Sequence, residues 1–169
     1  MHIDTFALAR AGAQSQGDVS LSRFERLLEG LPEQAEGSRV AWTISGESDS
    51  SERIFLRLRV QGVVRMTCQR CMGPLDHAVQ VDSRLEIVQS ESDLADENDA
   101  DAALDDDAPD QIVGSHRFDI LELIEDELIM AVPYVPRHDV CVTLPSQQDG
   151  DVQDARPSPF AALAGLKKI

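Results

Sequence analysis

The feature that most constrains this chain is the spacing of its three cysteines and one of its histidines. Cys68 and Cys71 are separated by two residues, and so are His138 and Cys141. An apolar run over residues 63–67 precedes the first pair and a Gly-Pro pair follows it, which predicts a tight turn between two strands. In such a knuckle both sulfur atoms point at one spot, as a tetrahedral metal ion requires. The pattern predicts that the knuckle and the His-x-x-Cys segment meet around a zinc ion.

Three other interpretations of these residues stay open. A thioredoxin-like redox pair is disfavoured because that motif begins a helix, which the Gly-Pro pair after Cys71 prevents. A nucleophile pair of Cys141 and His138 lacks a recognisable oxyanion or base group. The residues could also be buried thiols beside a hydrogen-bonded histidine. A four-ligand zinc site leaves no coordination position open for substrate water, so it would stabilise the fold rather than catalyse.

Charge and cysteine content limit the partners and the compartment. The chain has 169 residues, a formal net charge of -16 and a pI near 4.4. A surface of this sign repels nucleic acid and anionic membranes, so we expect no DNA or membrane partner, and RNA contact only through a local basic patch. An odd number of cysteines and the short apolar run at residues 6–9 indicate reduced thiols without an export signal. We therefore expect a cytoplasmic protein.

The first half of the chain predicts one helix followed by strands. Residues 1–19 are polar, and we expect them to be loosely ordered. Helical spacing of apolar residues predicts an amphipathic helix from Ser20 that stops at Gly30. Alternating patterns predict strands over residues 40–45, 54–60, 63–67 and 77–88, the last with a possible bend near Asp82. Short connections favour antiparallel pairing, which predicts a small antiparallel sheet or a partly open barrel.

The second half predicts an acidic insertion and a second main helix. Residues 91–110 contain ten Asp or Glu and no Lys or Arg, which is typical of a disordered segment. Asp119 as N-cap and apolar residues at helical spacing predict a helix that ends before Pro133. We interpret its acidic residues as a solvated face because no histidine accompanies them at metal-ligand spacing; these residues are Glu122, Glu125, Asp126 and Glu127.

These elements predict one α+β domain over residues 20–144, with two main helices and the Cys-x-x-Cys knuckle. Residues 145–169 are expected to form a mobile tail ending in a short amphipathic helix, with Phe160, Leu163 and Leu166 on one face. Isolated helices of this length are marginal in water. The apolar face therefore needs a docking surface on this protein or on a partner.

Positive charge is concentrated between Arg53 and Arg70, a stretch that contains no Asp or Glu. Alternation places Arg57 and Arg59 on one face of a strand, where guanidinium groups could bind phosphate oxygens. Charged side chains on the wet face of an antiparallel sheet are an equally good explanation. Candidate residues for contact with RNA or a partner are Arg57, Arg59, Arg65, Arg70, Phe160, Leu163, Lys167 and Lys168.

Several ordered motifs together resemble one family. They are Cys68-Gln69-Arg70-Cys71 after the arginine-bearing strand, the acidic gap, Glu125-Asp126-Glu127, the proline-containing run from residue 132 to residue 141, and the end of the chain from Pro159. This combination resembles the YceD family, the large ribosomal RNA subunit accumulation proteins. The resemblance implies a non-enzymatic role in synthesis, processing or stability of 23S ribosomal RNA, with that RNA or a pre-ribosomal particle as partner. The alternative is an acidic protein-binding module that holds a basic ribosomal protein before assembly.

Overall fold

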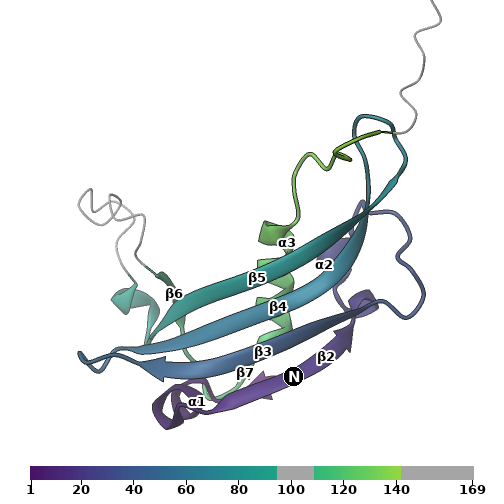
Figure 1. The fold of residues 1–169 in the computed structure, drawn as a ribbon. Coiled ribbons are helices and arrows are strands. Elements are labelled where there is room, and N and C mark those ends of the chain that lie inside the picture. Colours follow the sequence, from purple (N-terminus) through teal and green to yellow (C-terminus); the bar gives the residue numbers. More distant parts are fainter. Residues whose placement is uncertain (95–108, 142–169) are drawn as a thin grey trace, which may run out of the picture.

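A five-stranded open sheet organises the molecule (Figure 1). The computed structural model describes residues 1–94 and 109–141. Strand order is β2-β3-β4-β5-β6, and neighbouring strands are antiparallel except for the parallel pair β5–β6. The strands are β2 (Gln14–Ser20), β3 (Arg39–Ser48), β4 (Ile54–Thr67), β5 (Pro74–Val88) and β6 (Asp110–Val113). The order makes β2 and β6 the two edges of an open sheet.

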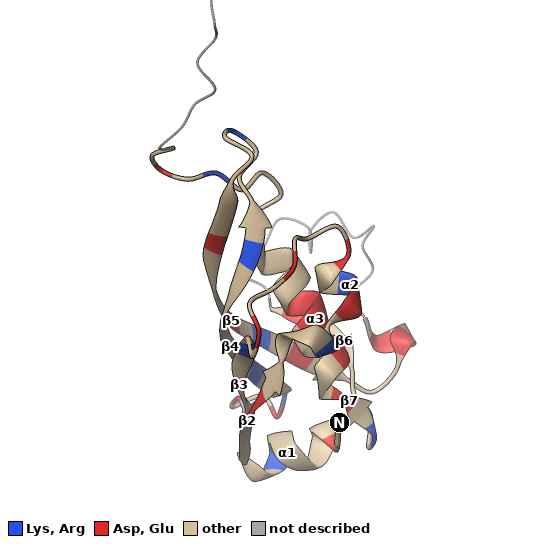
Figure 2. Cartoon of the chain, turned by 90° about the vertical axis from the view of Figure 1, so that its right-hand side faces the viewer, with Lys and Arg blue, Asp and Glu red and all other residues tan. Residues whose placement is uncertain are grey.

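The helices lie on one side of this sheet, as the edge-on view in Figure 2 shows. They are α1 (Thr5–Ala11), α2 (Glu25–Leu28) and α3 (Ile120–Ala131), with 3-10 turns at Leu21–Arg23 and Glu91–Asp93. A two-stranded sheet pairs β1 (His2–Ile3) with β7 (Phe118–Asp119). The β4–β5 hairpin extends beyond the helical layer and carries the knuckle at its tip.

The core forms between the helices and one face of the long strands. Leu56, Leu58 and Val60 alternate along β4 and are fully buried. Ile124 and Leu128 of α3 are buried in the same cluster. Successive side chains of a strand point to opposite faces, so the arginines between these apolar residues lie on the outer face. The sequence alternation therefore fixes which face of the sheet receives the helices.

Helix α3 is the second main helix predicted from the sequence. The side chain of Asp119 accepts a hydrogen bond from the Leu121 backbone N–H at 3.0 Å, which caps the first turn. The helix ends at Ala131, two residues before Pro133, as the missing proline N–H requires. The first main helix is shorter than predicted, because Phe24 at φ -100° and ψ 76° separates the 3-10 turn from α2.

The expectation that residues 1–19 are loosely ordered is wrong, since β1, α1 and β2 lie there. Helix α1 packs so closely on β3 that a Cβ at Gly46 would lie 2.2 Å from the Leu8 carbonyl oxygen. Strand β2 pairs with β3 over seven residue pairs. Its order comes from these tertiary contacts rather than from its own apolar content.

Other expectations need smaller corrections. Residues 54–67 form one strand rather than two, and β5 is continuous through Asp82. The expectation of disorder over residues 91–110 is wrong at both ends, where Glu91–Asp93 forms a 3-10 turn and Asp110 begins β6. Residues 95–108 and the predicted tail at 145–169 lie outside the described residues. Among the described helices, none is long and apolar enough to span a membrane.

Candidate metal centre

The knuckle is a tight turn that connects β4 to β5. The Cys68 backbone N–H donates to the Gly73 carbonyl at 2.9 Å, and the Met72 N–H donates to the Cys68 carbonyl at 2.8 Å. Met72 adopts a left-handed conformation with φ 60°. Only a few non-glycine residues adopt such a conformation, and here it lets the chain reverse direction directly after Cys71. No helix begins at the pair, as the Gly-Pro sequence predicts.

The segment after α3, residues 132–141, reaches the knuckle and binds its backbone. The Gln69 N–H donates to the Pro136 carbonyl at 2.9 Å, and the Gln69 side chain donates to the Tyr134 carbonyl at 3.4 Å. Prolines at 133 and 136 limit the conformations of this connector, which lowers the entropy lost when it docks. Figure 1 shows the connector running from α3 to the hairpin tip.

The four predicted ligands converge at this contact. Ligand atoms of Cys68, Cys71, His138 and Cys141 all lie within 4.8 Å of one another. The Cys68 and Cys141 sulfur atoms are 3.7 Å apart, and His138 Nδ1 lies 3.4 Å from the Cys71 sulfur and 3.9 Å from that of Cys141. A zinc tetrahedron with ordinary bond lengths has S···S edges of about 3.8 Å and S···N edges of about 3.5 Å. These spacings fit a metal ion at the centre.

Backbone donors stabilise the thiolate form of Cys68. Burial raises the pKa of this thiol. The backbone N–H groups of Cys71, His138 and Arg70 donate to the sulfur, and together they lower the pKa by more than burial raises it. The net result is a pKa of about 5, against an ordinary value of 9.0. A thiolate is the form that binds metal, so the site favours the required protonation state.

Arg70 holds the second segment against the knuckle. Its Nε donates to the Cys141 sulfur at 3.0 Å, and its terminal nitrogen donates to the His138 carbonyl at 2.7 Å. Although burial raises the pKa of Cys141, the Arg70 guanidinium and His138 lower it, and the net shift is downward. Arg70, a candidate for RNA contact, thus has its guanidinium hydrogen-bonded within the candidate metal centre.

A hydrogen bond orients the imidazole of His138. Nε2 lies 3.0 Å from the Pro74 carbonyl oxygen, which can only accept, so Nε2 carries the proton. Nδ1 is then the free nitrogen that faces the sulfur atoms. Hydrogen bonds to Cys141 and Cys68 raise the pKa of the His138 ring above its ordinary value. Metal-binding histidines are commonly fixed by such a contact on the second nitrogen.

Four protein ligands complete the coordination that a structural site needs. Cys68 is fully buried and the other three residues are half-buried. Such a cluster can hold a metal ion without an open position for a substrate. Since the two segments are about 70 positions apart in the chain, a bound ion would join the hairpin tip to the end of the domain. We refer to the four residues and the bound segments as the clasp.

The outer face of the sheet carries the predicted arginines, but carboxylates pair with them. Arg57 donates to both oxygens of Asp82 at 2.7 and 3.0 Å, and Arg59 donates to the same carboxylate at 3.2 Å. Arg65 donates to both oxygens of Asp76 at 2.8 and 3.1 Å. The Arg57 guanidinium, and after it that of Arg59, lower the pKa of Asp82 to about 2 although partial burial raises it. The face is therefore less basic than the sequence of β4 indicates.

Two acidic residues of α3 contradict the prediction of a solvated face. Glu125 is 9% exposed, and its Oε1 accepts from the backbone N–H groups of Arg26 at 2.8 Å and Leu27 at 3.2 Å. Phe24 cannot cap α2, so the Glu125 carboxylate does this from another helix. Glu127 is 7% exposed and accepts from the Ser83 hydroxyl. Glu122 and Asp126 are exposed as expected.

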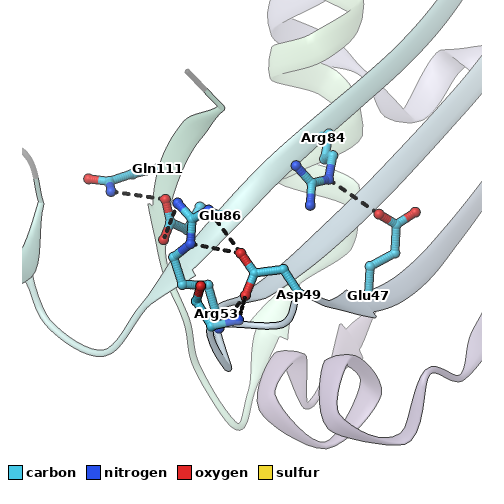
Figure 3. Close-up of polar contacts among 7 residues, drawn as sticks. Glu47, Asp49, Arg53, Arg84, Glu86 and Gln111 are labelled. Atoms are coloured by element: carbon cyan, nitrogen blue, oxygen red, sulfur yellow. Dashed lines mark hydrogen bonds and ion pairs between the residues drawn. The ribbon is translucent and has the colours of Figure 1, made fainter. Parts of the chain in front are cut away.

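A second polar cluster lies at the opposite end of the sheet, around the β3–β4 turn (Figure 3). Asp49 accepts from the Arg53 backbone at 3.0 Å and from its side chain at 2.9 Å. Arg53 also lies 3.9 Å from Glu86, which accepts from Gln111 of β6 at 3.2 Å. Nearby, Arg84 lies 3.7 Å over the ring of Phe55. These contacts stabilise the turn and the edge strand β6, and each of the two arginines in the cluster pairs with at least one carboxylate.

Sequence reasoning found the four residues of the candidate metal cluster but missed the roles of Arg70 and Glu125. Arg70 lies between the two cysteines, yet nothing in its spacing indicates that it contacts Cys141. The role of Glu125 was also missed, because its partners are backbone groups 98 and 99 positions away. Phe160, Leu163, Lys167 and Lys168 lie outside the described residues.

Comparison with known proteins assigns the family. A family model described as "Large ribosomal RNA subunit accumulation protein YceD" matches residues 56–167, which include the clasp. A relative with the same description, from Haemophilus influenzae, is 30% identical over 158 residues, or 90% of this chain and 86% of the relative. No solved structure matches. On the strength of the family model and this relative, the chain belongs to the YceD family.

Proposed function

We propose that this chain is a non-enzymatic factor in the cytoplasm that supports accumulation of 23S ribosomal RNA during assembly of the large subunit. The observation that carries the proposal is the family match, whose description names large ribosomal RNA subunit accumulation. A closed four-ligand cluster supports the non-enzymatic part, because it offers no coordination position for a substrate. In this proposal the clasp holds zinc and stabilises the fold.

The proposed partner is large-subunit ribosomal RNA or a pre-ribosomal particle, bound through the outer face of the sheet. Arg57, Arg59 and Asp82 together carry one net positive charge, and Arg65 with Asp76 carries none. Binding would then depend on exchanging carboxylates for phosphate oxygens. This predicts modest affinity that falls as salt rises.

Two variants test the RNA contact in opposite directions. The double variant Arg57→Glu/Arg59→Glu should weaken binding to large-subunit ribosomal RNA, whereas Asp82→Asn should strengthen it, because it releases both guanidinium groups. Filter binding over a series of salt concentrations measures both effects, and the salt slope should become shallower by about 2 in the double variant. Equal affinity of wild type and both variants would remove the sheet from the proposal.

Crosslinking in cells tests the role itself. Purified crosslinked protein should carry large-subunit ribosomal RNA or a precursor particle above the level recovered with an unrelated acidic protein. Recovery of neither RNA nor particle would contradict the proposal, whatever the purified protein binds in solution.

A second candidate function is an acidic module that holds a basic ribosomal protein before assembly. The observation that favours it is the distribution of exposed apolar side chains. Among the described residues, nine large apolar side chains are exposed. Seven of them lie on the β4–β5 hairpin, at the end of α3 or on the connector; they are Val63, Met72, Ile129, Met130, Tyr134, Val135 and Val140. Crosslinks to a ribosomal protein that persist in Arg57→Glu/Arg59→Glu would favour this function.

A further inference from the structure

An apolar groove of about 1000 Å³ lies beside the clasp. Its walls come from α2 and the turn after it, the end of β4, the knuckle, and the end of α3 with the connector. Leu31 and Met66 line it from the first two elements, and Met72, Ile129 and Tyr134 line it from the others. The groove therefore includes the knuckle and the connector, the two segments that the clasp holds together.

The side chains at the mouth of this groove are more exposed than apolar residues usually are. Met72 is 74% exposed, Tyr134 is 96% exposed and Ile129 is 38% exposed. Contiguous apolar surface of this kind commonly marks a binding site. Leu27 and Met66, at 4% exposure each, show that the floor is continuous with the core.

The C-terminal segment of the chain is long enough and apolar enough to occupy this groove. The described structure ends at Cys141, whose sulfur contacts Arg70, while the adjacent residue Gln69 lines the groove. Residues 142–158 could span up to about 55 Å if extended, far more than the groove requires. Phe160, Leu163 and Leu166 recur at the spacing of one helical face.

Charge also favours this occupant over another segment of the chain. Lys167 and Lys168 directly follow the apolar face and are the only lysines in the sequence. Glu29 lines the groove, is exposed, and forms no salt bridge with any described residue. Arg26 also lines the groove, but its guanidinium is paired with Glu125 and Asp126. A segment that is apolar and ends in two positive charges therefore matches an apolar groove with Glu29 at its rim.

We propose that residues 159–169 of this same chain dock in the groove, with Phe160 and Leu163 against its apolar floor and the two lysines beside Glu29. The inference goes beyond the proposed function and does not depend on RNA binding. A flexible tether of this length gives an effective concentration of about 1 mM, so a groove with a Kd near 0.1 mM would be about 90% occupied. The docked segment covers the exposed apolar side chains of the knuckle.

Hydrogen exchange of the full-length, metal-loaded chain tests the docking. Amides of residues 159–169 should exchange about tenfold more slowly than in an unstructured chain, and Phe160→Asp/Leu163→Asp should remove this protection. The same double variant should accelerate exchange in residues 26–32 and 129–136 but leave β2 and β3 unchanged. Val63→Asp is the matched control, because Val63 is 50% exposed on β4 of the same hairpin but does not line the groove or belong to the clasp.

Charge reversal tests the seating of the lysines. Glu29→Lys should reduce protection of residues 159–169, and combining it with Lys167→Glu/Lys168→Glu should restore part of it. Restoration shows direct proximity, since an unfolded groove would not be rescued. Protection that is absent in wild type, or that Phe160→Asp/Leu163→Asp does not change, overturns the proposal.

Other occupants of the groove give different results. A second copy would produce a dimer in light scattering that dissociates in Phe160→Asp/Leu163→Asp, with protection that depends on protein concentration. A basic ribosomal protein would protect the groove only when it is added. Either result overturns docking in the same chain and leaves the role in RNA accumulation to its own crosslinking test.

Discussion

At the scale of single residues, the most informative side chain is Glu125. Its carboxylate satisfies two backbone donors of α2 that Phe24 leaves without a cap. We expect Glu125→Ala to lower the free energy of unfolding by about 2 kcal/mol, because buried donors lose a charged acceptor. Urea unfolding measures this. Glu122→Ala, on the exposed face of the same helix, should change it by less than about 0.5 kcal/mol, and equal effects would contradict the capping role.

The Asp82 carboxylate makes the stability of the fold depend on pH. Its folded-state pKa of about 2 is below the ordinary 3.8, so its contribution to stability is complete above pH 3.8 and is lost as pH falls toward 2. At neutral pH, Asp82→Asn should lower the free energy of unfolding by no more than about 1 kcal/mol, since solvent screens this exposed cluster. The difference from wild type should shrink between pH 4 and pH 2 in urea titrations. A difference that stays constant over this range would show that the ion pairs of Asp82 with Arg57 and Arg59 do not contribute to stability.

At the scale of elements, the contact between α1 and β3 sets a steric limit. A Cβ at Gly46 would lie 2.4 Å from the Ala9 Cα and closer still to a backbone oxygen of α1. We expect Gly46→Ala to cost about 2 kcal/mol and to expose residues 5–11 to exchange, since the helix must move. Gly62→Ala is the control within the same sheet, because its Cβ would come no closer than 3.2 Å to Val40. Similar losses in both variants would contradict the steric argument.

Comparison of elements shows what the sequence could and could not reveal. Helix α3 and the long strands were predictable because their apolar residues repeat at the period of one buried face. Strand β2 was not, since none of its residues is fully buried and its order depends on β3. The convergence of the four candidate ligands was predictable from spacing, whereas pairing of Arg57 with Asp82 depends on a register that no local pattern encodes.

At the scale of the whole molecule, the clasp joins two segments that are distant in the chain. We expect about one zinc per chain in protein purified without chelator, and a loss of most of it in Cys71→Ser. Removal of metal should accelerate exchange in residues 68–73 and 132–141 while β2 and β3 stay protected. Elemental analysis and hydrogen exchange measure these effects.

The matched control for the metal is His77→Ala. His77 lies in β5 near the knuckle but outside the cluster, so this variant should retain its metal. Less than a few tenths of zinc per chain in the wild type would contradict the proposal of structural zinc, because sites of this ligand set bind tightly.

The parallel pairing of β5 and β6 has a consequence for how this molecule can vary. Leu85 lies opposite Asp110 and Val88 opposite Val113, so the chain needs to travel back only about 11 Å between the two strands. Residues 89–109 connect them, which is several times the length that this return requires. Insertions or deletions between these strands would leave every strand register intact, so evolution is free to adjust the length and acidity of this connection without rebuilding the domain.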